Sequence, residues 1–265
     1  HELSMAYRAM AMVHRNANEW DRFREVVQRR RALLETAFTP SDADLYIDLI
    51  TSYLTAGNYS DAVRTGHEFL EMAEKLRSPT GIYNASARLA SALFYNNQWD
   101  EAQDFADRAI DMGQRFYAAG PLAADPLLYS GVMAAARGDE EQAHERVRQL
   151  EAIPYDIPPE HRGPRQFALN IAALLEDREL VARLLPRVEQ EKPRCLTCTL
   201  LFHLDEGEAR LLLGDVDGAQ AKLTQRRIVR LVDTVTRDWQ MDPVERTTQT
   251  RGQRVGDVDQ LPGVG

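Results

Sequence analysis

The sequence contains only two cysteines, Cys195 and Cys198, among 265 residues. Two cysteines cannot supply the multi-disulfide framework of small secreted domains, so we expect a reducing, cytoplasmic setting. The pair has the spacing Cys195-x-x-Cys198, but a zinc site needs four ligands and no second pair exists in the sequence. A redox pair of the thioredoxin type would follow a strand, and no strand pattern precedes this one. We therefore predict that both cysteines pack in the core and bind no metal.

Long apolar runs are also missing. The longest nearly apolar stretch covers residues 127–136, whereas a membrane helix needs roughly 20 such residues. The net charge is -9 and the isoelectric point about 5.3, and such a surface repels nucleic acid and anionic lipid. We therefore expect neither membrane insertion nor direct binding of nucleic acid.

Signatures of catalysis are equally scarce. The sequence has no Gly-rich phosphate loop and no serine nucleophile elbow. The segment His67-Glu68-x-x-Glu71 lacks the second histidine of a zinc-protease helix. We predict a protein that is not an enzyme and needs no cofactor. The chain opens on His1 without an initiator methionine, from which we expect a fragment or a processed form.

What the sequence does contain is an internal repeat. A turn followed by a small closing residue recurs, most clearly as Gly57-Asn58-Tyr59-Ser60-Asp61-Ala62. The closing residues fall at positions 23, 62, 102, 143, 182 and 219, with successive spacings of 39, 40, 41, 39 and 37. Runs of helical periodicity flank most of these turns, and prolines fall mostly between repeats. This period predicts an all-α superhelix of about six helix-turn-helix repeats.

The repeated phrases resemble the signature of the tetratricopeptide repeat (TPR) family. The resemblance is carried by Leu49-Ile50-x-x-Tyr53-x-x-x-Gly57-x-Tyr59-x-x-Ala62, by residues 130–138 and by residues 207–219. It covers about residues 4–225 and implies an α-α solenoid. The sequence departs from the family pattern at Ile50 and Asn170, which replace small residues, and in a period near 40 instead of about 34. Longer repeats of this kind resemble the sensor regions of LuxR-type transcription activators and the tails of some nucleotide cyclases.

The C-terminal part differs in composition. Residues 222–254 hold eight basic and four acidic side chains. The simplest interpretation of this basic excess is a helix face exposed to solvent. Apolar positions between residues 223 and 239 predict a helix that closes the solenoid, as such arrays require. Thr, Gln, Gly and Asp are common from residue 247 onward. We therefore expect a solenoid with its closing helix over residues 1–245 and a disordered tail over residues 246–265.

The resemblance further implies that the first helix of each repeat lines the concave face. Counting along these helices gives six candidate partner-binding residues, which are Arg8, Arg15, Arg88, Phe94, Tyr95 and Tyr129. Aromatic rings beside arginines are typical of binding hot spots. An equally good alternative is that the rings of Phe94 and Tyr95 merely pack against adjoining repeats. The chaperone-tail clamp of the family is not expected, because Met12 and Thr51 stand at its asparagine positions.

These features favour a non-catalytic protein-interaction module of a larger bacterial signalling or regulatory protein. Its partner would be a protein or peptide segment held in the concave groove. The alternative is a small-molecule sensor domain of a transcription activator, with the effector inside the superhelix. An enzymatic role would rest on little beyond the cysteine pair. A deep apolar pocket would favour the sensor, and an open groove would favour the binding module.

Overall fold

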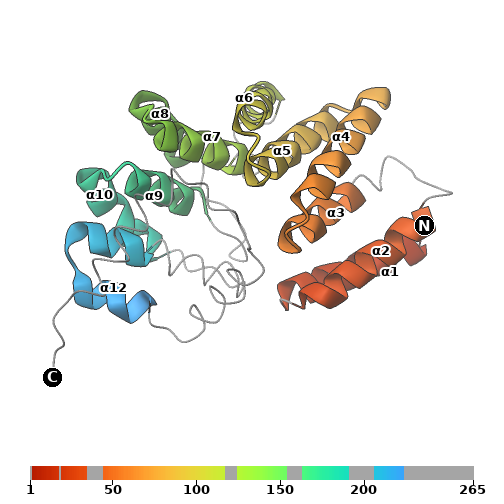
Figure 1. The fold of residues 1–265 in the computed structure, drawn as a ribbon, viewed down its shortest axis with the longest axis horizontal. Helices are drawn as coiled ribbons and strands as arrows, with labels where there is room; N and C mark the ends of the chain where they lie inside the picture. The colour runs from red at the N-terminus through yellow and green to blue at the C-terminus, as the bar shows by residue number, and fades with distance from the viewer. Residues whose placement is uncertain are drawn as a thin grey trace.

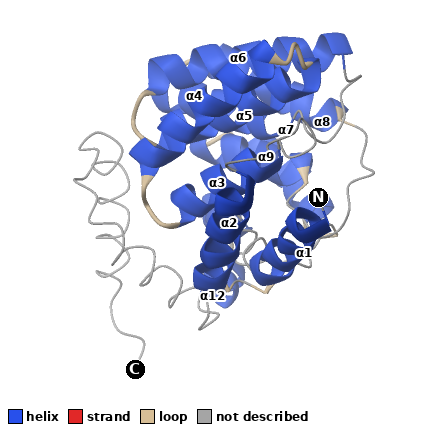
Figure 2. Cartoon of the chain, turned by 90° about the vertical axis from the view of Figure 1, so that its right-hand side faces the viewer, coloured by secondary structure: helices blue, strands red, loops and turns tan. Residues whose placement is uncertain are grey.

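The computed structural model describes residues 2–17, 19–34, 44–116, 124–153, 163–190 and 206–223. These residues form helices and turns without any strand (Figure 2), which confirms the predicted all-α fold. The helices occur in pairs, one pair to each repeat. The pairs are α1 (Glu2–Asn16) with α2 (Trp20–Leu34), α3 (Asp44–Thr55) with α4 (Tyr59–Lys75), α5 (Pro79–Tyr95) with α6 (Trp99–Phe116), α7 (Ala124–Arg137) with α8 (Glu140–Ala152), α9 (Pro164–Leu174) with α10 (Arg178–Val188), and a helix over residues 206–213 with α12 (Val216–Leu223).

Two residues build the turn inside each of repeats two to six. In repeat two, Gly57 adopts a left-handed φ of 74° and donates its N–H to the Leu54 carbonyl at 3.2 Å. The next N–H, that of Asn58, donates to the Tyr53 carbonyl at 2.9 Å, and Asn58 is also the N-cap residue of α4. This is the Schellman ending, which a left-handed residue makes possible. The same pair of hydrogen bonds closes the turns at residues 97–98, 138–139, 176–177 and 214–215.

The register predicted for repeat five is wrong by one residue. The predicted closing residue, Ala182, is exposed, whereas Val181 is fully buried. In this repeat Glu176, with a φ of 58°, takes the left-handed place that Gly138 takes in repeat four. A closing residue at Ala182 aligns Asp177 with that glycine, since Gly138 precedes Ala143 by five residues. Glu176 gives no signal of the true register, because a glutamate rarely adopts the left-handed conformation. With Val181 as the closing residue, the spacings from 143 to 181 and from 181 to 219 are both 38.

Small residues let neighbouring repeats approach closely. Gly66 of α4 lies against α5, where an added β-carbon would come within 2.8 Å of the Cδ1 atom of Leu89. Gly131 of α7 leaves similar room for Ile171 of α9. The closing alanines at positions 62, 102, 143 and 219 are fully buried. The repeated small residues are therefore explained by close helix packing.

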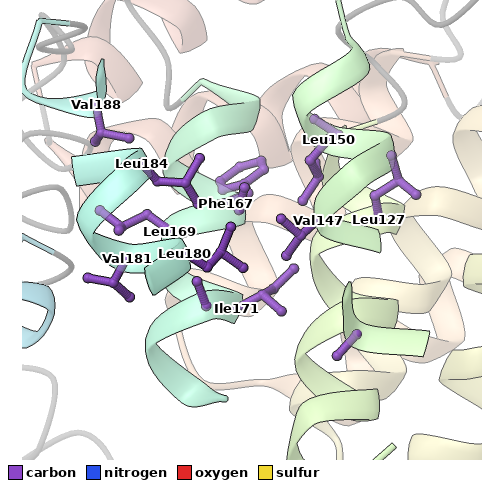
Figure 3. Close-up of a cluster of buried hydrophobic side chains, with 14 of the residues drawn as sticks. Leu127, Val147, Leu150, Phe167, Leu169, Ile171, Leu180, Val181, Leu184 and Val188 are labelled. Carbon is purple, nitrogen blue, oxygen red and sulfur yellow. The ribbon is translucent and has the colours of Figure 1, made fainter. Parts of the chain in front are cut away.

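The hydrophobic core continues from repeat to repeat. One cluster joins α7 to α10, where the side chains of Phe167, Ile171 and Leu184 pack together (Figure 3). A second cluster includes Phe69 and Leu89 of the middle repeats, and a third surrounds Phe23 of repeat one. This succession is expected of a solenoid, in which each repeat contacts only its neighbours.

The repeats form an arch, with α3, α5, α7 and α9 on its inner side and α6, α8 and α10 on its outer side (Figure 1). The first helices of successive repeats pack on one another, α3 on α5, α5 on α7 and α7 on α9. The inner wall of the arch is therefore made of first helices. None of the helices in the described ranges is long and apolar enough to cross a membrane.

Three predictions fall outside the described residues. They are the closing helix beyond residue 223, the tail over residues 246–265 and the Cys195-x-x-Cys198 pair. All three stay predictions.

Candidate interaction groove

The six predicted partner-binding residues all lie on first helices, as expected. Arg8 and Arg15 belong to α1, and Tyr129 belongs to α7. The remaining three, Arg88, Phe94 and Tyr95, belong to α5. All six side chains are half-buried. The structure divides them into two groups, one between α1 and α3 and the other between α5 and α7.

The first group belongs to a network that we call the charge junction, which consists of Arg8, Arg15, Arg30, Asp44 and Asp48. Arg30 comes from the second helix α2 and is only 1% exposed. Its guanidinium donates two hydrogen bonds to Asp44, at 2.9 and 3.0 Å, and lies 3.7 Å from Asp48. Arg8 lies 2.7 Å from Asp44, and Arg15 lies 3.8 Å from Asp48. Five charges thus join repeat one to repeat two.

Asp48 is the buried carboxylate of the charge junction, with a side chain that is 10% exposed. Desolvation raises the pKa of Asp48 to about 6, against the lowering effect of Arg15 and the other two arginines. Asp44, which carries the same charge, raises it further. At neutral pH the carboxylate is therefore ionised in a place where its burial opposes the charge.

The second group begins with an ion pair at the edge of the α5/α7 contact. Arg88 lies 3.3 Å from Asp125 of α7, and the two side chains are 34% and 41% exposed. All three predicted groove arginines are thus paired with an aspartate of the next repeat's first helix. A partner carboxylate would have to compete with these aspartates for the guanidinium groups.

Beside this ion pair lie five rings in continuous contact, which we call the aromatic cluster: Tyr59, Phe94, Tyr95, Trp99 and Tyr129. The ring centroid of Phe94 lies 5.3 Å from those of both Tyr95 and Tyr129. Trp99 stacks on Phe94 at 5.7 Å and donates its indole N–H to the Phe94 carbonyl at 3.2 Å. Tyr59 stacks on Tyr95 at 5.9 Å. The cluster therefore connects repeats two, three and four.

The aromatic cluster is an uncharged platform at neutral pH. Desolvation holds the pKa of Tyr129 well above its ordinary value, and the neighbouring Tyr95 adds to the increase. Desolvation also raises the pKa of Tyr59. The phenols of Tyr59 and Tyr129 therefore stay protonated and can donate hydrogen bonds, while the half-buried rings offer apolar contact.

Sequence reasoning missed the residues that complete both groups. Asp44, Asp48 and Asp125 follow Arg8, Arg15 and Arg88 at about one repeat length, and this spacing of opposite charges could have identified them. Tyr59 and Trp99 were assigned only to the turn signature. Arg30 could have been found from its helix face, since it follows Phe23 by seven residues. Of these missed residues, Arg30 is the one that comes from the middle of a second helix, whereas the others come from first helices or from the turns.

Comparisons with known proteins agree with this architecture. A crystal structure of Rap protein complexed with competence and sporulation factor superposes with a TM-score of 0.64 at 12% identity. That match covers 90% of this chain, which spans 66% of the length of the Rap chain. Two structures of a kinesin light chain protein of Podosopora anserina with nearly identical TPR-like repeats, one of them of a single-residue variant, each give a TM-score of 0.52. Their identities are 19% and 17%, over 74% and 76% of this chain and 98% and 100% of theirs.

No protein-family model and no curated protein matches the sequence. At identities of 12% to 19%, the likeness to solved structures is a likeness of fold. The kinesin light chain structures consist of TPR-like repeats, and this chain consists of repeated helix pairs with Schellman turns and an inner wall of first helices. The chain therefore has the fold of a TPR-like helical repeat solenoid.

Proposed function

We propose that the chain is a protein-interaction module that binds a peptide or helical segment on its inner wall, with the aromatic cluster as the anchor. The observation that carries this proposal is the unbroken contact of five half-buried rings across three repeats. Rigid rings give a large contact area at a small loss of side-chain entropy, which is why they dominate binding hot spots.

The surroundings of the cluster indicate the chemistry of the partner. Arg88 and Asp125 neutralise each other beside the rings, and the phenol of Tyr129 adds a polar group without charge. Such a surface fits an apolar or aromatic side chain flanked by hydrogen-bonding groups. Arg8 and Arg15 would contribute less than the rings, because each must first leave an aspartate.

The similarity to the Rap structure supports the proposal at the level of the fold. The Rap protein was crystallised in complex with competence and sporulation factor, so a solenoid of this kind can hold a partner. We further propose that the module serves a larger bacterial regulatory protein. Effector sensing inside the superhelix, as in a transcription activator, stays the alternative, and a single bound metabolite in the purified protein would favour it.

The test uses peptides selected against the whole chain from a random-peptide display library. Binding is followed through the fluorescence of Trp99, after Trp20→Phe and Trp239→Phe have removed the other two tryptophans. Because Trp99 stacks on Phe94, occupation of the cluster should change its emission. We expect Tyr95→Ala to weaken the selected peptides about 30-fold, which corresponds to about 2 kcal/mol.

The matched control is Tyr46→Ala. Tyr46 also lies on a first helix, but its ring stacks on Phe69 of α4 at 5.2 Å instead of on a ring of the aromatic cluster. We expect this variant to lose stability and to retain peptide affinity. Equal affinity of the folded Tyr95→Ala variant and the parent protein would remove the aromatic cluster from the binding site.

A further inference from the structure

His144 of α8 lies between two oxygen atoms that accept hydrogen bonds. Its Nδ1 atom is 2.7 Å from the carbonyl oxygen of Glu140, one turn earlier on the same helix. Its Nε2 atom is 3.0 Å from a carboxylate oxygen, Oδ2 of Asp177, in the turn before α10. A neutral imidazole carries one N–H and can donate only one of these hydrogen bonds, whereas an imidazolium donates both. The geometry therefore favours the protonated ring.

Asp177 is held in position to accept this hydrogen bond. It is the N-cap residue of α10, and its Oδ1 atom accepts the N–H of Leu180 at 2.9 Å. Its own N–H donates to the Ala172 carbonyl at 3.1 Å and closes the turn inside repeat five. The N–H of Leu180 and the ring of His144 both lower the pKa of Asp177. The carboxylate is therefore ionised at neutral pH and presents its second oxygen to the histidine.

The charges around His144 favour its proton. The hydrogen bond to Asp177 raises the pKa of His144 most and the Glu140 carbonyl adds to the increase, whereas desolvation opposes it. Apart from Asp177, the charged residues between positions 176 and 187 are exposed. On the elements that pack beside α8, the other charged side chains are paired or distant: Asp125 with Arg88, Arg137 with Asp100, Arg183 with Glu151, and Arg165 in the first turn of α9, at the end opposite Asp177.

His144 and Asp177 form a bridge between α8 and α10, two helices on the outer side of the arch (Figure 1). Each of these helices packs more closely on α9 than on the other, so side chains contribute much of the link between them. A second bridge joins Arg183 of α10 to Glu151 of α8 through hydrogen bonds of 2.6 and 2.8 Å. Because an arginine keeps its charge at every pH of interest, only the bridge of His144 depends on a proton.

We propose that His144 is a proton-dependent clasp between repeats four and five, closed by the imidazolium and released by the neutral ring. On release, the first turn of α10 moves away from α8, while the bridge of Arg183 retains the later turns. The stabilisation is complete below the ordinary pKa of 6.5 and is lost as pH rises through the raised pKa of His144. Since α9 of the inner wall packs on both α8 and α10, the proton also controls how firmly that wall is supported.

The first experiment follows the ring signals of His144 by NMR in the whole chain as pH is varied. The signals are assigned by their loss in His144→Gln. Asp177→Asn should lower the pKa of His144, because it removes the carboxylate while asparagine still caps the helix. The matched control is Asp215→Asn, which changes the capping aspartate of α12 and should leave His144 unaffected. Equal pKa values of His144 in the parent and in Asp177→Asn would overturn the proposal.

The second experiment measures amide hydrogen exchange between about pH 6 and pH 9, corrected for the intrinsic rate at each pH. The Val181 N–H, which donates to the Asp177 carbonyl, should lose about two- to fivefold in protection as His144 deprotonates, the range of a partly exposed ion pair. The Val188 N–H, in the last turn of α10, should keep its protection. His144→Arg should keep Val181 protected throughout, and His144→Gln should leave it less protected at every pH.

Two results would contradict the clasp. If the protection of Val181 were constant while His144 titrates, or fell equally in His144→Arg, the proton on this ring would not hold α10. If Val188 lost as much protection as Val181, the whole helix would respond, and the proposed release of its first turn would be wrong.

Discussion

Two junctions between neighbouring repeats have opposite chemistry. Between repeats one and two, α1 and α2 are joined to α3 by the charge junction, whose central arginine, Arg30 of α2, is 1% exposed. Between repeats three and four, α5 and α7 are joined by the aromatic cluster, with one exposed ion pair beside it. Neighbouring repeats can therefore be joined by charged side chains in one place and by aromatic side chains in another.

The difference has consequences for stability and for binding. Buried charges depend on every partner being present, so the charge junction should respond strongly to substitution and to pH. Stacked rings lose little stabilising contact when one polar neighbour is substituted, and their exposed edges remain available to a ligand. We therefore expect repeats one and two to hold the structural charges and repeats three and four to hold the partner.

The largest expected effect is that of Arg30→Ala. The substitution removes two hydrogen bonds to Asp44 and one of the arginines near Asp48. Removing one partner of a buried ion pair costs about 3–5 kcal/mol, and urea unfolding at neutral pH would measure this loss. The matched control is Arg29→Ala, since Arg29 is 57% exposed and pairs with Glu25 on the same helix. A loss in Arg30→Ala no larger than in the control would show that the charge junction does not stabilise the fold.

The fold could be predicted because the turn has a sequence signature. Gly57, Gly138 and Gly214 occupy left-handed positions, and glycine is the residue that such positions favour. The prediction lost its register only where Glu176 takes this place, since a glutamate gives no signal of a left-handed turn. The burial of the closing alanine could be predicted because this residue always follows the turn by the same few residues. The length of the repeat does not change that distance.

The candidate groove was predictable only in part. Helical periodicity places Phe94 and Tyr95 on a first helix, and the structure shows them both packed against adjoining repeats and half-buried. The two interpretations left open by the sequence therefore do not exclude each other. The partners of the arginines were not predicted, because which residue of the next helix faces Arg88 depends on how the two helices are inclined. The helical periodicity of a sequence gives no information on the angle between two packed helices.

A smaller effect is expected from pH, and of these two junctions only the charge junction should show it. The pKa of Asp48 is about 6 in the folded chain and 3.8 when unperturbed, so the folded state binds the proton more tightly. The free energy of unfolding should therefore fall as pH rises from about 4 to about 6, by up to ~3 kcal/mol. Arg8, Arg15 and Arg30 face the carboxylate and reduce this loss, whereas Asp44 increases it.

The measurement compares urea unfolding of the parent and of Asp48→Asn at a series of pH values. The difference between them should grow in favour of the variant as pH rises through that window, because the amide never ionises. A difference that is constant with pH, or that changes in the opposite direction, would show that Asp48 does not titrate in this range. The cost of Arg30→Ala should also be smaller below this window than at neutral pH, since a protonated Asp48 needs no cation.

The smallest effect is expected from Arg88→Ala in the aromatic junction. Like the Arg30–Asp44 pair, the Arg88–Asp125 pair joins two neighbouring repeats, but its side chains are 34% and 41% exposed, and water screens such a pair. We expect Arg88→Ala to change the free energy of unfolding by less than about 1 kcal/mol. A double-mutant cycle with Asp125→Ala would measure the coupling directly, and the Arg30/Asp44 cycle, run in parallel, should give a coupling several times larger. If the two cycles gave equal couplings, burial would not be what separates the two junctions, and the stability of each would have to come from the helix packing around it.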